Sequence, residues 1–300
     1  MSSPNSTTAI LYAFAANLGI AAAKTGAAFW TGSGSLLAEA IHSFADCGNQ
    51  VLLFIGMKRS EKEATRKHPM GFGRESYIWS MMVAFILFSV GGVFSIYEGS
   101  LRYTHPHTVE NEGVALLVLL IALGLEYFSL KNALAAIQPE KGTRSLWQWF
   151  KETQSSELMV VTGEDLAALA GLGIALVMLG LTMITGNTAY DAAGSILIGF
   201  LLITVAVVVG TQVHSLLLGE AAEDISENVQ QYLESQPCVL QVLNVWAINH
   251  GNNVMVTIKA ELQPDMTVMN AVDEINAMER QIRQTHARVK WIFFEIDNTD

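Results

Sequence analysis

Six long apolar segments limit what this chain can fold into. They cover residues 8–30, 36–57, 77–99, 113–135, 158–184 and 189–213. At a rise of about 1.5 Å per residue, a helix over any of them would cross a hydrocarbon core of about 30 Å. Charged residues make up only 15% of the chain, against about a quarter in an ordinary soluble domain. The sequence therefore predicts an α-helical membrane protein whose domain of six transmembrane helices covers residues 1–213.

The remaining residues, 214–300, hold most of the acidic excess. Hydrophobic periodicity predicts helices over 224–235 and 267–285, and strands over 239–248, 252–262 and 289–296. This α-β-β-α-β order is typical of an α+β sandwich with both helices on one face of a small sheet. We expect residues 214–300 to form a separate C-terminal α+β domain.

Basic residues concentrate in two of the connections between apolar segments. The connection after the second segment holds Lys58, Arg59, Lys62, Arg66, Lys67 and Arg74, and the one after the fourth holds Lys141, Arg144 and Lys151. Lys and Arg accumulate on the cytoplasmic side of a membrane. We therefore expect both connections, both termini and the C-terminal domain to lie in the cytoplasm.

The second apolar segment carries ionisable residues that a membrane helix does not hold without a reason. His42 and Asp46 are four residues apart, so they project from one helix face. Asn49 extends this polar stripe by one further turn. Because a carboxylate in hydrocarbon costs several kcal/mol unless it is paired or solvated, an ionisable residue at this depth indicates a functional site. We predict that these side chains bind a cation.

The fifth apolar segment contains the adjacent carboxylates Glu164 and Asp165, followed by a run of Ala and Gly. Neighbouring residues on a helix face directions about 100° apart, so both cannot point at one centre without local distortion. Small residues allow close helix packing, and we expect the second segment to be the neighbour. His42, Asp46 and one or both of these carboxylates would then surround a shared position.

Other polar residues in the apolar segments have simpler interpretations. We expect Glu126 to pair with Lys24, with a role in proton relay as the alternative, and Glu98 to pair with Arg102 on the helix surface. His105 and His107 are expected to be solvated loop residues. Trp147 and Trp149 suit a short helix at the cytoplasmic interface or, equally, soluble packing.

Several classes of protein are excluded. There is no Gly-x-x-x-x-Gly-Lys-Ser/Thr run for a nucleotide and no His-Glu-x-x-His motif for a metalloenzyme, so we expect neither direct use of ATP nor enzyme activity. The net charge of −11 does not suit nucleic acid. The only cysteines, Cys47 and Cys238, indicate no disulfide framework.

In this order and spacing, the motifs resemble the cation diffusion facilitator family over nearly the whole chain. They are Asn17 and Lys24, Thr31-Gly-Ser-Gly-Ser35, His42-Ser-Phe-Ala-Asp46, His68-Pro-Met-Gly-Phe-Gly-Arg74, Asp165 and Asp191-Ala-Ala-Gly-Ser195. Residues 42–50, 73–79 and 163–165 look most like the branch that includes the mitochondrial zinc transporter of animals.

The resemblance implies a homodimeric exporter that exchanges a divalent metal, Zn²⁺ first, for protons across a lipid bilayer. The implied tetrahedral site takes two residues from the second helix and two from the fifth. His42, Asp46 and Asp165 match three of these positions, but the fourth falls on Val161, which cannot ligate. Glu164, if the helix opens at Gly163, is the best substitute, and Asn49, Thr162 or water are the others.

The resemblance also has implications for the connection after the second apolar segment and for the tail. His68 matches one ligand of an accessory site in the family, but Phe72 stands where another histidine is expected, so we predict a weak site or none. The tail is implied to be ferredoxin-like, similar to metallochaperones, with His250 and His286 as weak metal candidates. We expect a multi-pass protein of the bacterial inner membrane. Two alternatives remain: selectivity for manganese, iron or cobalt, and a membrane metal sensor that binds without transport.

Overall fold

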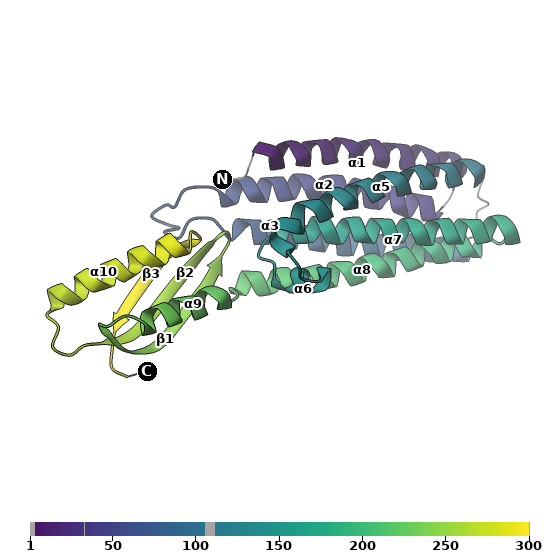
Figure 1. The fold of residues 1–300 in the computed structure, drawn as a ribbon. Helices are drawn as coiled ribbons and strands as arrows, with labels where there is room; N and C mark the ends of the chain where they lie inside the picture. Colours follow the sequence, from purple (N-terminus) through teal and green to yellow (C-terminus); the bar gives the residue numbers. More distant parts are fainter. Residues whose placement is uncertain (1–3, 33, 106–111, 300) are drawn as a thin grey trace. The chain divides into compact units, whose positions relative to one another are not determined.

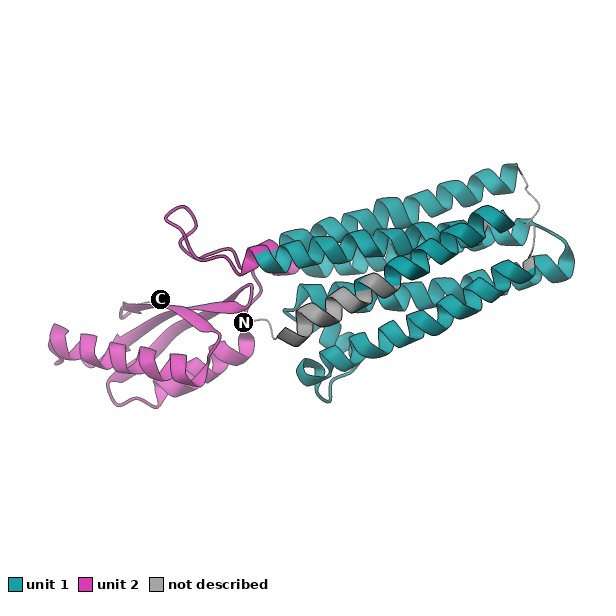
Figure 2. Cartoon of the chain, turned by 90° about the horizontal axis from the view of Figure 1, so that it is seen from above, with its two compact units in different colours: residues 1–58, 76–214 teal, residues 59–75, 215–300 magenta. Residues whose placement is uncertain are grey.

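The structure is a computed structural model that describes residues 4–32, 34–105 and 112–299; the side chains of 4–13, 15–16, 34–35 and 112 lie outside the description. The chain divides into two compact units (Figure 2). The first comprises residues 1–58 and 76–214, and the second comprises residues 59–75 and 215–300. His107 falls outside the described residues.

The first unit is a bundle of helices (Figure 1). They are α1 (Pro4–Thr31), α2 (Gly34–Ser60), α3 (Glu75–Ile86), the π-helical segment η1 (Leu87–Val93), α4 (Phe94–Thr104), α5 (Glu112–Lys141), α6 (Leu146–Glu152), α7 (Ser156–Thr185) and α8 (Ala189–Leu218). Each predicted apolar segment falls within one of these helices or, for residues 77–99, within the continuous run α3–η1–α4. The predicted short helix around Trp147 is α6, where Trp149 is buried and Trp147 exposed.

Four helical stretches among the described residues are long and apolar enough to cross a membrane. They are Glu75–Thr104, Gly113–Lys141, Ser156–Thr185 and Ala189–Leu218. Large apolar side chains on these helices are exposed, including Phe85, Phe128 and Phe200. Such a surface suits lipid rather than water. The chain is therefore a multi-pass membrane protein.

Apolar side chains from several helices pack together in the core of the bundle. Leu36 of α2, Leu119 of α5, Leu172 of α7 and Ile198 of α8 are fully buried in one cluster. The π-helical segment approaches α8 at two glycines. A Cβ on Gly199 would lie 2.7 Å from the carbonyl oxygen of Gly92, so the two backbones are nearly in contact, as small residues permit in membrane helix pairs.

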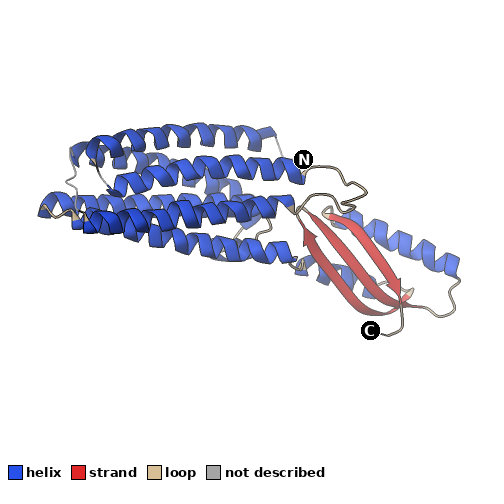
Figure 3. Cartoon of the chain, turned by 180° about the vertical axis from the view of Figure 1, so that it is seen from behind, coloured by secondary structure: helices blue, strands red, loops and turns tan. Residues whose placement is uncertain are grey.

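The second unit contains the predicted tail elements in the predicted order. They are α9 (Glu223–Glu234), β1 (Val239–His250), β2 (Asn253–Leu262), α10 (Val268–Thr285) and β3 (Val289–Ile296). The central strand β2 pairs antiparallel with β1 and parallel with β3. Figures 1 and 3 show α9 and α10 on the same face of this sheet. Alternate residues of β2, among them Val256 and Ile258, point into the core beneath the helices.

The connection of residues 59–75, between α2 and α3, packs against the turn between β1 and β2. A Cβ on Gly73 would lie 2.7 Å from the carbonyl oxygen of His250, and one on Gly251 would lie 2.5 Å from the carbonyl oxygen of Gly73. Gly251 has a φ of +63°, a conformation that glycine adopts without strain. This connection, which we predicted to be cytoplasmic from its basic residues, is part of the same compact unit as the tail.

Candidate metal site

The α2 pair, His42 and Asp46, lies on a buried face of α2. One turn of helix brings His42 Nδ1 to 3.4 Å from Asp46 Oδ1. Both side chains are inside the bundle, with the His42 side chain fully buried. The spacing predicted from the sequence is thus present as a contact, and it places an imidazole and a carboxylate next to each other.

The α7 pair, Glu164 and Asp165, faces two different helices. Asn49 Nδ2 of α2 donates a hydrogen bond to Glu164 Oε1 over 2.5 Å, whereas Ser129 Oγ of α5 donates one to Asp165 Oδ2 over 3.0 Å. This divergence follows from the rotation of about 100° between adjacent helix positions. The helix α7 is continuous through Gly163, so Glu164 reaches α2 without the helix opening considered from the sequence.

Buried atoms able to ligate a metal are left without hydrogen-bond partners at this level of the bundle. Among the described residues, these atoms are both ring nitrogens of His42, Asp46 Oδ1, Asn49 Oδ1, Gln50 Oε1 and Thr162 Oγ1. A buried polar atom without a partner is uncommon and needs an explanation, of which a bound ion is one. Imidazole nitrogen and carboxylate oxygen are ligands that Zn²⁺ accepts.

The two pairs do not converge on one point. Among the side chains that the structure describes, no three of His, Cys, Asp and Glu are grouped closely enough to hold a metal ion. Glu164 is instead hydrogen-bonded to Asn49 of α2 and Asp165 to Ser129 of α5, while the ring nitrogens of His42 and Asp46 Oδ1 have no hydrogen-bond partner among the described residues. A metal bound by both pairs would require these side chains, or the helices that hold them, to rearrange.

A second group of buried polar residues lies beside the site, and we call it the Lys24 cluster: Lys24, Glu39, Ser43 and Glu126. Lys24 Nζ lies 2.8 Å from Ser43 Oγ, 3.2 Å from Glu39 Oε2 and 3.7 Å from Glu126 Oε1. The expected pairing of Glu126 with Lys24 is confirmed. The sequence analysis missed Glu39, although its position three residues before His42 on one apolar helix was a usable signal. The predicted pair of Glu98 and Arg102 is also confirmed, at 2.7 Å.

The accessory candidates lie apart from one another. His68 is exposed and packs its ring against Phe72, with 4.7 Å between ring centroids. His250 stands edge-on to Trp291 and lines a cavity of about 120 Å³. Burial, and then the positive charge of Arg74, lower the pKa of His250.

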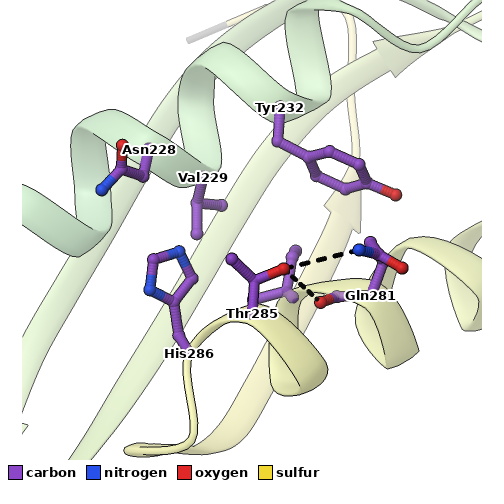
Figure 4. Close-up of a pocket in the computed structure, with 7 residues that line it drawn as sticks. Asn228, Val229, Tyr232, Gln281, Thr285 and His286 are labelled. Atoms are coloured by element: carbon purple, nitrogen blue, oxygen red, sulfur yellow. Dashed lines mark hydrogen bonds between the residues drawn. The ribbon is translucent and has the colours of Figure 1, made fainter.

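His286 lines a different cavity of about 270 Å³ between α9 and α10, where Figure 4 shows its ring beside Asn228 and Val229. The other polar side chains lining it are Tyr232, Gln281 and Thr285, and Thr285 Oγ1 donates to the carbonyl oxygen of Gln281 over 3.0 Å. Because His250 and His286 line separate cavities, the structure does not bring them together as ligands of one metal.

Apolar helices long enough to span a bilayer, with ionisable side chains buried among them, define a multi-pass membrane protein with a polar site inside its bundle. Residues 10–218 match the family model of the cation efflux transmembrane domain. The chain belongs to this cation efflux family, whose members are transporters and not enzymes.

Curated relatives agree with this assignment. The chain is 32% identical over 262 residues to the mitochondrial proton-coupled zinc antiporter SLC30A9 of Xenopus laevis, covering 85% of this chain and 47% of the relative. It is 33% identical over 244 residues to the human protein of that name, covering 80% and 43%. It is 31% identical over 201 residues to metal tolerance protein C4 of Arabidopsis thaliana, covering 65% and 44%. The chain thus spans about half the length of the curated relatives it matches.

Proposed function

We propose that this chain exports a divalent metal, zinc in the first place, in exchange for protons, using the α2 pair and the α7 pair as its transport site. The observation that carries the proposal is the group of buried, unpartnered nitrogen and oxygen atoms at this level of the bundle. Relatives named proton-coupled zinc antiporters match the chain over most of its length and support the choice of metal.

The proposed exchange follows from competition at shared ligand atoms. Neutral His42 and ionised Asp46 and Asp165 can hold a divalent cation. Protonation occupies the imidazole lone pair and removes carboxylate charge, so metal and protons exclude each other. If the bundle opens this position alternately to the two sides of the membrane, an inward proton gradient drives metal outward.

Glu164 is our candidate for the fourth ligand in place of Val161. It already lies against α2 through its hydrogen bond with Asn49. Closing α2 onto α7 would let Glu164 exchange that hydrogen bond for the metal, with Asn49 Oδ1 as a further oxygen ligand. The oxygen-rich donor set leaves manganese, iron and cobalt as metals to be compared with zinc.

The remaining features of the proposal concern the membrane and the assembly. We infer six transmembrane helices, α1 and α2 being the two beyond the four membrane-crossing stretches, and a cytoplasmic domain over residues 214–300. The basic connections support cytoplasmic termini. A homodimer is supported by the outer face of the tail sheet, where Trp246 and Phe293 lie in one cross-strand row and are 61% and 58% exposed.

The test is metal uptake into proteoliposomes with an acidic interior, comparing zinc, manganese, iron and cobalt. Wild type and Asp165→Ala are measured beside Glu98→Gln, a control that removes a carboxylate from a helix-surface ion pair. We expect gradient-dependent uptake of zinc that is lost in Asp165→Ala and kept in Glu98→Gln. Binding without flux of any metal would favour a sensor, and flux that survives Asp165→Ala would move the site away from Asp165.

A further inference from the structure

The Lys24 cluster holds one basic and two acidic side chains inside the bundle, on three different helices. The side chains of Lys24 of α1 and Glu39 of α2 are completely buried, and that of Glu126 of α5 is 5% exposed. None of these residues is among the predicted metal ligands. Their arrangement therefore needs an explanation of its own.

The cluster is not balanced in charge. Lys24 lies closer to Glu39 than to Glu126, at 3.2 Å against 3.7 Å, and it also donates a hydrogen bond to Ser43. The positive charge is thus matched by Glu39, and an ionised Glu126 would leave one negative charge in excess. A buried net charge in a membrane protein is costly. A proton on Glu126 removes that excess.

Glu39 Oε1, the carboxylate oxygen that does not face Lys24, shows how closely the Lys24–Glu39 ion pair is packed. Glu39 Oε1 has no hydrogen-bond partner among the described residues. It lies against α7, where a Cβ on Gly171 would be 2.5 Å away. Glu39 is thus confined between α1 and α7, whereas Glu126 has the looser contact and is the carboxylate more able to change its state.

We propose that Glu126 is a proton-binding site of the transport cycle, separate from the metal ligands, and that Lys24 and Glu39 are the charged residues that position it. This inference rests on the proposed function as a metal–proton exchanger. In this inference, Glu126 releases one proton in addition to the protons that the metal displaces from its own ligands.

The helices connect this proton site to the metal site. Glu126 and Ser129 are three residues apart on α5, and Ser129 donates its hydrogen bond to Asp165. On α2, Glu39 and Ser43 flank His42 in sequence. A movement of α2 and α5 relative to α7 on metal binding would therefore change the surroundings of Glu126 and of the metal site together.

The charges around Glu126 determine the direction of the coupling. Lys24 of α1 favours the ionised form of Glu126. Among the described residues, Glu39 and Asp46 of α2 and Asp165 of α7 are the acidic groups that favour the protonated form, and the Cys47 thiol of α2 is a further titratable group that interacts with Glu126. A divalent cation at the metal site offsets this negative charge, so metal binding favours release of the proton from Glu126. Metal and proton are then exchanged rather than carried together.

The experiment counts protons released when zinc binds to the detergent-solubilised full chain, using a pH indicator in weak buffer. Wild type is compared with Glu126→Gln and with the control Glu98→Gln. We expect Glu126→Gln to bind zinc and to release about one proton fewer per zinc than wild type, while Glu98→Gln matches wild type. Equal proton release from wild type and Glu126→Gln would overturn the inference.

A second variant covers the case in which Glu126→Gln does not fold. The double variant Lys24→Met, Glu39→Gln removes one charge of each sign and leaves Glu126 without its cation. Glu126 then stays protonated, so this variant should also release about one proton fewer per zinc, and an unchanged count would overturn the inference. If wild type itself binds no zinc, the proposed function fails; if wild type binds zinc and releases protons but neither variant differs, only the Glu126 site fails.

Discussion

Asn49 Nδ2 donates a hydrogen bond to Glu164 Oε1 over 2.5 Å, and this contact ties α2 to α7 between the two halves of the candidate site. Asn49 therefore holds a carboxylate that would otherwise be buried without a donor. It also occupies one of the two carboxylate oxygens of Glu164. The bond is a direct target for mutation.

Asn49→Ala should destabilise the metal-free protein. Loss of the donor leaves the Glu164 carboxylate unsatisfied, which costs about 1–3 kcal/mol. Thermal unfolding in detergent without zinc should show a lower midpoint than in wild type. An exposed amide in the tail, Asn252→Ala, is the control. An unfolding midpoint that matches wild type would contradict this role for Asn49.

Gly171 and Gly173 should respond differently to alanine although they are two residues apart on α7. A Cβ on Gly171 would meet Glu39 Oε1 at 2.5 Å, whereas a Cβ on Gly173 meets nothing within 4 Å. We expect Gly171→Ala to lose about 1–3 kcal/mol of stability and Gly173→Ala to be neutral or slightly stabilised. Thermal unfolding of the zinc-free variants measures the difference. Similar midpoints for the two variants would show that Glu39 is not held at that position.

Gly251→Ala should release the connection of residues 59–75 from the tail. Alanine at a positive φ costs about 1–2 kcal/mol, and here its Cβ would also overlap the Gly73 carbonyl. Gly142→Ala is a matched control, since Gly142 has a φ of +56° but nothing within 4 Å of the added Cβ. Trypsin should cut the exposed connection at Lys62, Arg66 or Lys67 faster in Gly251→Ala than in Gly142→Ala. Equal cleavage rates would mean that this contact does not hold the connection in place.

His250 should make the tail less stable as the pH falls. Its pKa lies below the ordinary value of 6.5 because burial disfavours the charged ring and Arg74 repels it. The unfolded chain therefore binds the proton first, so stability is complete above the unfolded pKa and decreases as the pH falls through and below the ordinary value of 6.5. Thermal unfolding of wild type and His250→Gln across this range should show a steeper loss in wild type. Parallel pH profiles would refute the prediction.

Much of the fold could be predicted from local patterns. Apolar length located the helices of the bundle, and alternation in residues 254–260 located the central strand of the tail. The helical rotation between Glu164 and Asp165 also indicated correctly that they face different directions. These features depend on period and spacing within one element, which a single sequence contains.

Contacts between elements could be predicted only in part. The pairing of Lys24 with Glu126 followed from the cost of burying either charge, but nothing local showed that Glu39 is the closer partner. The π-helical turns at Leu87–Val93 lie where Gly92 packs against α8, and no local pattern in the sequence predicts them. The contact of Gly73 with Gly251 joins residues far apart in the chain, and no periodic pattern records it.

The most direct measurement is the internal pH of proteoliposomes when zinc is added outside with no initial pH gradient. If each zinc ion enters in exchange for protons, the interior becomes alkaline as zinc accumulates. We predict this rise for wild type and Glu98→Gln and its absence in Asp165→Ala. Entry of zinc with no change in internal pH would contradict metal–proton exchange.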